Sequence, residues 1–232
     1  MDRGTLLLYG VLPYVAIAVF LAGHYWRYRT DQYGWTARST QILESRMLRL
    51  GSTAFHFGAL AAIGGHVIGM CIPESVTEAA GISESFYRWF AGIAGGIAGA
   101  ATVIGLAGLL YRRATSDRVR QTTTRMDMLT YFLLTVLIVL GCWMTFGYTL
   151  FTNDPHNYRD SISPWWQSLF YLDPDVSAAT EAPLIYQLHA IIAWAFWASF
   201  PFSRLVHAWS IPFQYVGRPY ILYRRRFPTP ER

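Results

Sequence analysis

The sequence contains no lysine, and all nineteen of its basic side chains belong to arginine. Only two cysteines occur, Cys71 and Cys142, and both lie in apolar stretches, as small buried side chains do. A disulfide between the two is the alternative, and nothing else in the sequence supports it. Charged residues make up only 14% of the chain against 53% hydrophobic residues, a balance that excludes an ordinary soluble domain.

Five apolar runs are each about 20 residues or longer, the length at which a helix crosses the hydrocarbon core of a bilayer. We therefore predict an all-α integral membrane bundle in a single domain, residues 1–232. The first run resembles a secretory signal, but no small-residue cleavage site precedes Gly23, so we interpret it as a retained helix. The predicted transmembrane helices are 5–26, 50–72, 89–111, 128–151 and 184–209.

The segments between these runs alternate in charge. Arginines dominate 27–49, 112–127 and the tail 211–232, whereas acidic residues dominate 73–88 and 152–183. Cytoplasmic loops carry the excess of arginine, so the N-terminus is predicted outside and 211–232 forms a basic cytoplasmic tail. We expect a multi-pass protein of the cell inner membrane that does not bind nucleic acid, because the arginines form no single stripe.

The longest connection, 152–183, contains Pro164, Trp165 and Trp166. Tryptophan is enriched at membrane–water interfaces, so we expect this segment to lie in the outer headgroup region as an interfacial anchor.

Four histidines lie inside apolar runs, and an ionisable residue in hydrocarbon is a functional candidate by default. The predicted topology places His66 and His189 in the outer half of the membrane and His56 and His207 in the inner half. Imidazole is a good axial ligand of haem iron, so each pair is predicted to hold one b-type haem. Covalent c-type attachment is excluded, because the sequence has no Cys-x-x-Cys-His.

Helical geometry gives these pairs partial support. His189 and His207 are eighteen residues apart, which is about five whole turns, so a regular helix would present both on one side. His56 and His66 are ten residues apart, and the two rises, ~27 Å and ~15 Å, disagree. We expect a kink at Pro201 to absorb the difference.

Glycines surround the two histidines of the second run, namely Gly58, Gly64, Gly65 and Gly69. They leave room for a flat porphyrin, or they permit close packing between membrane helices. Hydrogen bonding between helices and metal-ion transport are the alternatives for the histidines, although a transporter is expected to carry intramembrane carboxylates, which these runs lack. His24 and His156 are expected to be interfacial or solvated.

Longer motifs resemble one known family. They comprise Gly65-His66 with Gly69-Met70, the segment 118–127 with Arg118-Val119-Arg120, residues 33–39, and the block from Phe200 to Pro212. At these residues the chain resembles the gamma subunit of membrane-bound respiratory nitrate reductase, a dihaem b-type cytochrome. The resemblance implies five helices, an outer N-terminus and ligation of two haems by the same four histidines.

The resemblance also implies a quinol-oxidising site beside the outer haem, near Gly65, His66 and Gly69, that takes menaquinol or ubiquinol. Electrons would then pass through the inner haem to an iron–sulfur (beta) and a molybdenum (alpha) subunit docked on the cytoplasmic side. The chain has no cysteines for a cluster or a pterin, so it is expected to oxidise quinol for a nitrate reductase (quinone) complex and not to reduce nitrate itself.

The sequence departs from the family pattern at one position. The family's quinol site can use a lysine just before the third helix, and here the nearest basic residue is Arg88, next to Tyr87. Arg88 either binds quinol or is a surface charge that balances Glu84. The arginine-rich inner loops suit a protein partner or anionic membrane lipids. Two alternatives remain open: an anchor of a sulfite-reductase-linked or heterodisulfide-reductase-like complex, or a non-redox haem or ion transporter.

Overall fold

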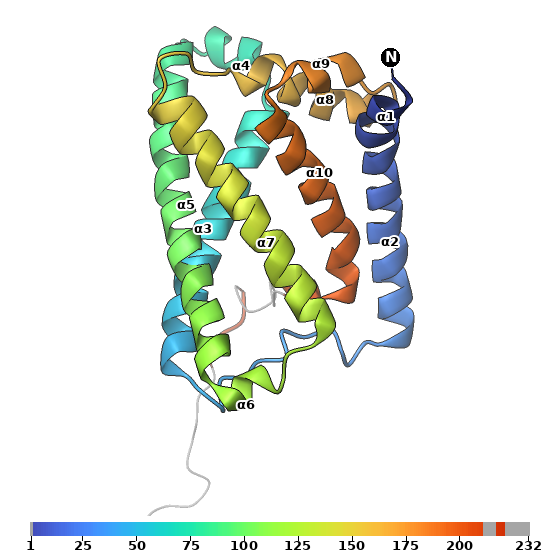
Figure 1. The fold of residues 1–232 in the computed structure, drawn as a ribbon, viewed down its shortest axis with the longest axis vertical. Coiled ribbons are helices and arrows are strands. Elements are labelled where there is room, and N and C mark those ends of the chain that lie inside the picture. The colour runs from blue at the N-terminus through green and yellow to red at the C-terminus, as the bar shows by residue number, and fades with distance from the viewer. Residues whose placement is uncertain (1, 211–216, 221–232) are drawn as a thin grey trace, which may run out of the picture.

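The computed structural model describes residues 2–210 and 217–220, and this part of the chain folds into helices joined by loops, with no strand (Figure 1). The predicted tail 211–232 therefore lies outside the described residues except for 217–220. Five helices are long and apolar enough to cross a membrane, which confirms the predicted number. They span Arg3–Thr30, Arg46–Cys71, Glu84–Thr115, Arg125–Leu150 and Leu184–Phe202.

Each span is built mainly from one α-helix, and short helices lie between the spans. The first span joins α1 (Arg3–Thr5), a π-helical turn (Leu6–Val11) and α2 (Leu12–Thr30). The second and third are α3 (Arg46–Cys71) and α5 (Glu84–Thr115), and the fourth is α7 (Arg125–Trp143) with a π-helical extension (Met144–Leu150). The fifth is α10 (Leu184–Ser199) with a 3₁₀ turn (Phe200–Phe202). The connecting helices are α4 (Glu74–Ala79), α6 (Asp117–Arg120), α8 (Ile162–Ser168) and α9 (Val176–Glu181), with 3₁₀ turns at Tyr158–Asp160 and Leu169–Tyr171. A 3₁₀ segment, Arg204–Ser210, follows the fifth span.

Several helices begin and end beyond the apolar runs because capping side chains and charged turns extend them. Ser83 caps α5 by accepting a hydrogen bond from the Phe86 N–H at 3.4 Å, so α5 begins at Glu84, five residues before the predicted start. At the other end of α5, Arg112 and Arg113 lie in the last turn, where cations favour the negative end of the helix dipole. α7 begins with a capping box formed by Thr124 and Asp127.

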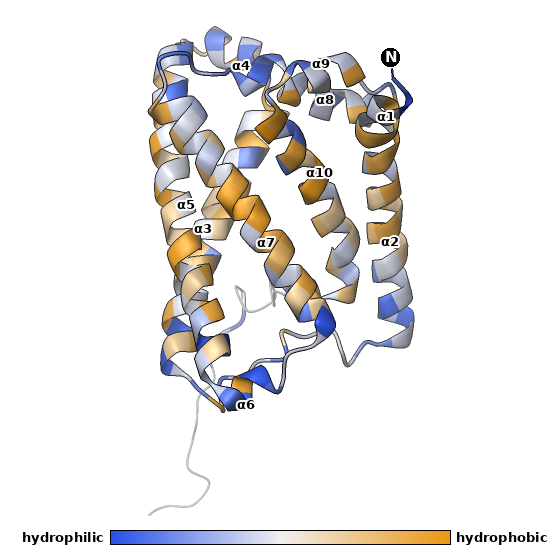
Figure 2. Cartoon of the chain, viewed as in Figure 1, coloured by the Kyte–Doolittle hydropathy of each residue, from blue (hydrophilic) through white to orange (hydrophobic). Residues whose placement is uncertain are grey.

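The loops of like charge meet at opposite ends of the bundle (Figure 1). We call the end with residues 72–83 and 151–183, where the N-terminus also lies, the acidic end, and the end with 31–45 and 116–124 the basic end. Figure 2 shows hydrophilic residues gathered at both ends and apolar residues along the helices. Most apolar side chains of the spans are exposed on the bundle, as expected of helices that face lipid.

The main buried core lies at the acidic end, under α8 and α9. Trp165 is its centre: the side chain is 1% exposed, meets Tyr9 edge to face, and donates a hydrogen bond to the Tyr9 carbonyl at 2.9 Å. Trp166 stacks on Trp194 of α10 with ring centroids 5.6 Å apart. Trp165 is therefore not a lipid-facing anchor, because its side chain is buried at this end of the bundle; the position of the segment in the outer headgroup region stays a prediction.

α3 and α5 pack closely along their length, and glycines permit this approach. A Cβ on Gly58 would lie 2.6 Å from the backbone nitrogen of Thr102, and one on Gly105 would overlap the backbone of Phe55. For Gly58 the packing interpretation therefore holds and the porphyrin interpretation does not.

The predicted helix 184–209 is not continuous. α10 ends at Ser199, Phe200–Phe202 form a 3₁₀ turn around Pro201, and Ser203 is extended before a second 3₁₀ segment, Arg204–Ser210. Proline removes a backbone hydrogen bond and clashes with the preceding turn, which accounts for the break. The position of His207 is consequently not set by the helical repeat from His189.

Candidate functional site

The four histidines that the sequence predicts to lie in the membrane form two pairs. The ring centroids of His66 and His189 are 6.1 Å apart, and those of His56 and His207 are 6.0 Å apart. His56 and His66 belong to α3, His189 to α10 and His207 to the 3₁₀ segment after the break. The structure thus brings together the residues that topology pairs by depth.

Each separation suits one metal ion bound between two imidazoles. Two metal–nitrogen bonds of about 2 Å, with part of a ring on either side, give a centroid distance of about 6 Å. Hydrogen-bonded or stacked imidazoles in direct contact would lie closer together. The ring planes of His66 and His189 are 12° from parallel, whereas those of His56 and His207 make an angle of 69°.

Three of the four rings are held by a backbone carbonyl. Nδ1 of His56 donates to the Ser52 carbonyl at 2.7 Å, Nδ1 of His66 to the Ala62 carbonyl at 2.7 Å, and Nδ1 of His207 to the Arg204 carbonyl at 2.6 Å. A carbonyl can only accept, so Nδ1 carries the proton and Nε2 keeps the lone pair that a metal requires. Within the described residues, Nε2 of these three rings makes no hydrogen bond.

The fourth ring, His189, is placed by packing. Its Nδ1 is buried and has no hydrogen-bond partner among the described residues, although the ring lies near the backbone of Leu137. A methyl group added to Gly141 of α7 would lie 3.5 Å from its Cε1 atom. Close contact with α7 therefore orients this imidazole toward His66.

The remaining two histidines use their nitrogens within the protein. Nδ1 of His24 donates to the Phe20 carbonyl at 2.7 Å, and Nε2 accepts from the Trp209 indole at 3.0 Å. His156 pairs through Nε2 with the Ser161 hydroxyl at 2.9 Å and packs on Tyr186. Neither ring is simply solvated, and both hydrogen-bonding positions of His24 are taken; an interfacial position stays a prediction for both.

The glycines near His66 differ in their surroundings. A Cβ on Gly64 or Gly65 would meet no atom within 4 Å, whereas a Cβ on Gly69 would collide with the Tyr158 hydroxyl. Gly65 therefore has open space beside His66. Gly69 instead allows Tyr158 of the loop 151–183 to lie against α3.

Arg88 lines a cavity of about 80 Å³ at the acidic end, between α5, the π-helical extension of α7 and the loop 151–183. The cavity does not include Gly65, His66 or Gly69. Tyr158 connects the two places, because it covers Gly69 and also lines the cavity. The other polar side chains around it include Glu84, Tyr87, His156 and Asn157.

Burial shifts the titration of two groups in this cavity. It raises the pKa of the Tyr158 phenol far above its usual range, and the hydrogen bond with the Tyr87 hydroxyl at 3.0 Å adds to the effect. Burial also lowers the pKa of His156 below 6.5, against the opposing charge of Asp160. At neutral pH the phenol is therefore protonated and the imidazole is neutral.

Arg159 holds this end together and was not predicted from the sequence. It is 6% exposed, donates to the Thr77 hydroxyl at 2.9 Å, lies 3.4 Å from a Glu84 carboxylate oxygen, and stands 4.2 Å above the Tyr87 ring. Glu84 is thus balanced by Arg159, which removes the charge-balancing explanation for Arg88. The sequence signal was only one arginine in an otherwise acidic loop.

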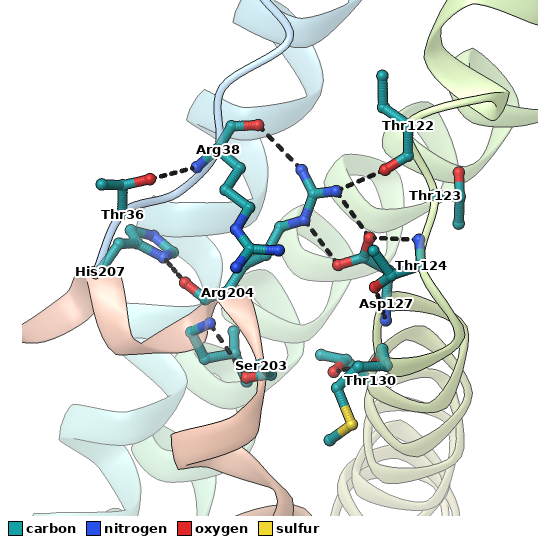
Figure 3. A network of polar contacts seen from close by, with 12 residues as sticks. Thr36, Arg38, Thr122, Thr123, Thr124, Asp127, Thr130, Ser203, Arg204 and His207 are labelled. Atoms are coloured by element: carbon teal, nitrogen blue, oxygen red, sulfur yellow. Dashed lines mark hydrogen bonds and ion pairs between the residues drawn. The ribbon is translucent and has the colours of Figure 1, made fainter. Parts of the chain in front are cut away.

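A second polar network lies at the basic end, around His207 (Figure 3). Arg204 pairs with Asp127 through two contacts of 2.7 Å and donates to the carbonyls of Thr122 and Arg38 at 2.8 and 2.9 Å. Arg27 donates to the carbonyls of Pro201 and Ser203 at 2.7 and 2.8 Å. These arginines hold the broken end of the fifth span.

Comparison with known proteins gives one consistent result. A family model described as nitrate reductase gamma subunit matches residues 5–226. The nitrate reductase gamma chain of Bacillus subtilis is 40% identical over 220 residues, covering 95% of this chain and 98% of that protein. The respiratory nitrate reductase 1 gamma chain of Escherichia coli is 36% identical over 223 residues, covering 96% and 98% respectively.

A third relative is longer. The nitrate reductase-like protein NarX of Mycobacterium tuberculosis is 46% identical over 220 residues, which cover 95% of this chain but only 34% of that protein. The chain thus spans about a third of the length of this relative.

Proposed function

Because the chain belongs to the nitrate reductase gamma subunit family, we propose that it is a dihaem b-type cytochrome that oxidises quinol and passes electrons to cytoplasmic redox subunits. The observation that carries this proposal is the two histidine pairs, each about 6 Å between ring centroids. A haem iron takes two axial ligands from the protein, and each pair supplies two imidazoles.

His66 and His189 would hold one haem, and His56 and His207 the other. A bis-histidine haem supplies one-electron transfer without an open coordination site. The carbonyls of Ser52, Ala62 and Arg204 support this assignment, since each holds the proton on Nδ1 and leaves the Nε2 lone pair of its ring free for a metal.

The quinol site is proposed at the acidic end, beside His66. Gly65 leaves open space for a flat headgroup next to this ring. Oxidation of quinol releases two electrons and two protons, so the site needs polar contacts as well as space. Tyr158 offers a protonated phenol and His156 a neutral imidazole, while Arg88 contributes positive charge. Gly69 takes part indirectly, because it admits Tyr158.

The basic end would face the cytoplasm, and the acidic end the outside. This orientation releases the quinol protons outside while electrons move inward, so the subunit would contribute to the membrane potential. Iron–sulfur and molybdenum subunits would dock on the basic end, as expected for the gamma chain of a nitrate reductase complex. Anionic lipid headgroups would occupy the arginines that the partners leave free.

The direct experiment is to purify the chain from membranes and measure its haem by the pyridine haemochrome method and by a reduced-minus-oxidised spectrum. We expect about two non-covalent b haems per chain. His66→Ala and His189→Ala should each remove the same spectral component, and His56→Ala and His207→Ala the other.

His24→Ala is the matched control, because this ring already uses both nitrogens within the protein. It should retain both components. A chain without haem would contradict the proposal outright. Loss of the same component in His56→Ala and His189→Ala would contradict the pairing.

A further inference from the structure

We infer that Arg204, held by Asp127, is a positioning residue that sets the place and protonation of His207 in the inner histidine pair. The inference rests on the proposed function, since it treats His207 as a haem ligand. It concerns how the chain presents this one ligand, and the outer pair serves as an internal reference.

His207 needs such support because no regular helix carries it. α10 ends at Ser199, and the backbone of Ser203 is extended, with φ −104° and ψ 179°. The following segment, Arg204–Ser210, is 3₁₀, in which hydrogen-bond geometry is poorer than in an α-helix. Something outside this segment has to fix its position relative to His56 on α3.

The Arg204 side chain ties the segment to two other parts of the basic end. Its guanidinium makes two contacts of 2.7 Å with the Asp127 carboxylate at the start of α7. It also donates to the Thr122 carbonyl at 2.8 Å and to the Arg38 carbonyl at 2.9 Å (Figure 3). A planar guanidinium with four such bonds has one allowed position, and Asp127 is only 6% exposed.

Asp127 is itself fixed by the capping box of α7. Its Oδ2 accepts from the Thr124 N–H at 2.9 Å, and its own N–H donates to the Thr124 hydroxyl at 3.1 Å. The carboxylate also lies at the positive end of this helix. Arg204 is therefore anchored to a rigid element and not to a mobile loop.

The same residue then holds the histidine. The Arg204 carbonyl accepts from His207 Nδ1 at 2.6 Å, and this bond leaves Nε2 unprotonated in a ring whose centroid lies 6.0 Å from that of His56. A shift of the Arg204 backbone would move the acceptor and hence the ring. The side chain of Arg204 fixes the segment, and its carbonyl fixes the tautomer and orientation of the ring.

The test compares Asp127→Asn and Arg204→Lys with wild type in the full chain, in native membranes. Both variants keep the size of the side chain but lose the doubly bonded ion pair. The measurements are haem content, the visible spectrum and the reduction potential of each component. We expect the spectral component of the inner haem to shift in reduction potential and band shape, and the affinity for that haem to fall about 10- to 100-fold. The component of the outer haem should stay unchanged.

Two further variants separate positioning from general stability. Asp117→Asn breaks the exposed ion pair with Arg120 at the same end but touches neither Asp127 nor Arg204, so both components should match wild type. Asp127→Glu keeps the carboxylate and should lie closer to wild type than Asp127→Asn.

Three outcomes would count against the inference. An inner component that is unchanged in Asp127→Asn and Arg204→Lys overturns it, while the proposed function survives. Equal loss of the outer and inner components in these variants also overturns it, because the effect is then global. Absence of haem in the wild-type chain overturns the proposed function first, and this inference with it.

Discussion

The outer and inner histidine pairs have nearly the same ring separation but reach it by different means. His66 and His189 both lie within regular membrane helices, α3 and α10, and their rings are nearly parallel. His56 also lies on α3, but its partner His207 follows a broken helix, and their planes are far from parallel. One pair is placed by helix packing, and the other by hydrogen bonds at the end of the bundle.

This difference predicts which substitutions displace the histidines of each pair. Apolar contacts between helices are numerous and individually small, so a single polar substitution should disturb the outer pair little. The inner pair depends on a few hydrogen bonds: Arg27 donates to the carbonyls of Pro201 and Ser203, the Arg204 side chain donates to Asp127, and the Arg204 carbonyl accepts from His207. Loss of one buried partner leaves another group unsatisfied, which costs more than the bond itself contributed.

The largest effect is expected at the outer pair, where open space adjoins one ring. Gly65→Leu should fill that space and slow quinol-driven reduction of both haems by about 100-fold, with their spectra intact. Gly64→Leu is the matched control, because the neighbouring position is equally open but points to another side of α3. Equal, near-normal reduction rates in both variants would move the quinol site elsewhere.

Each end of the bundle contains a buried arginine, so the two ends can be compared by the change in the free energy of unfolding when that arginine is replaced. Arg27→Met at the basic end and Arg159→Met at the acidic end should each destabilise the chain by about 3 kcal/mol, since each leaves buried acceptors unpaired. Thermal unfolding of the detergent-solubilised chain measures both. Only Arg27→Met should also alter the spectrum of the inner haem. If it altered the spectra of both haems equally, hydrogen bonds at the basic end would not act on the inner pair alone.

A smaller difference in stability is expected between phenylalanine substitutions of two adjacent tryptophans at the acidic end. Trp165→Phe loses the hydrogen bond to the Tyr9 carbonyl, whereas the Trp166 indole N–H is buried without a partner among the described residues. The two substitutions remove the same volume. Trp165→Phe should therefore be about 1 kcal/mol more destabilising than Trp166→Phe in thermal unfolding. Equal losses would mean that packing alone holds this core.

The smallest effects concern pH and differ between the ends. Burial lowers the pKa of His156, so its contribution to stability is complete above 6.5 and falls as the pH drops from 6.5 to its folded pKa. At the basic end, the Met47 N–H and Arg112 hold the pKa of Glu44 below 4.5. The stability that Glu44 contributes is complete above 4.5 and is lost as the pH falls through its folded pKa.

Unfolding measured against pH should resolve these two windows. His156→Asn should flatten the curve just below pH 6.5 and leave the acid limb unchanged. Glu44→Gln should do the reverse, flattening only the limb below pH 4.5. A single shared window would show that the two ends do not titrate independently.

Much of the fold was predictable because the membrane restricts what a chain can do. Apolar runs of sufficient length must form helices, since no water is present to satisfy the backbone. The predicted bounds were mostly shorter than the helices, because capping residues such as Ser83 and charged turns such as Arg112 extend them past the apolar run. Hydropathy does not register these features.

Some candidate functional residues were likewise predictable from the sequence, and others were not. The histidines stood out because ionisable groups in apolar runs are rare, and charge alternation assigned their depths. Tyr158 and Arg159 were not found, because a tyrosine and an arginine in a loop carry no signal of their own. Their roles come from contacts with Gly69, Thr77 and Glu84, which lie far away in the sequence.

The sequence by itself determined the number of membrane helices and which histidines share a depth, because hydrophobic length and charge bias act locally along the chain. Tertiary structure decided where His189 and His207 lie, whereas the carbonyls that hold His56 and His66 come from the preceding turn of the same helix. The break at Pro201 removed the helical repeat that would have placed His207, and hydrogen bonds from Arg27 of α2 and between Arg204 and Asp127 of α7 took over that task. Likewise, Trp165 became a core residue only because the loop 151–183 folds onto the bundle, where long-range contacts prevail over local composition.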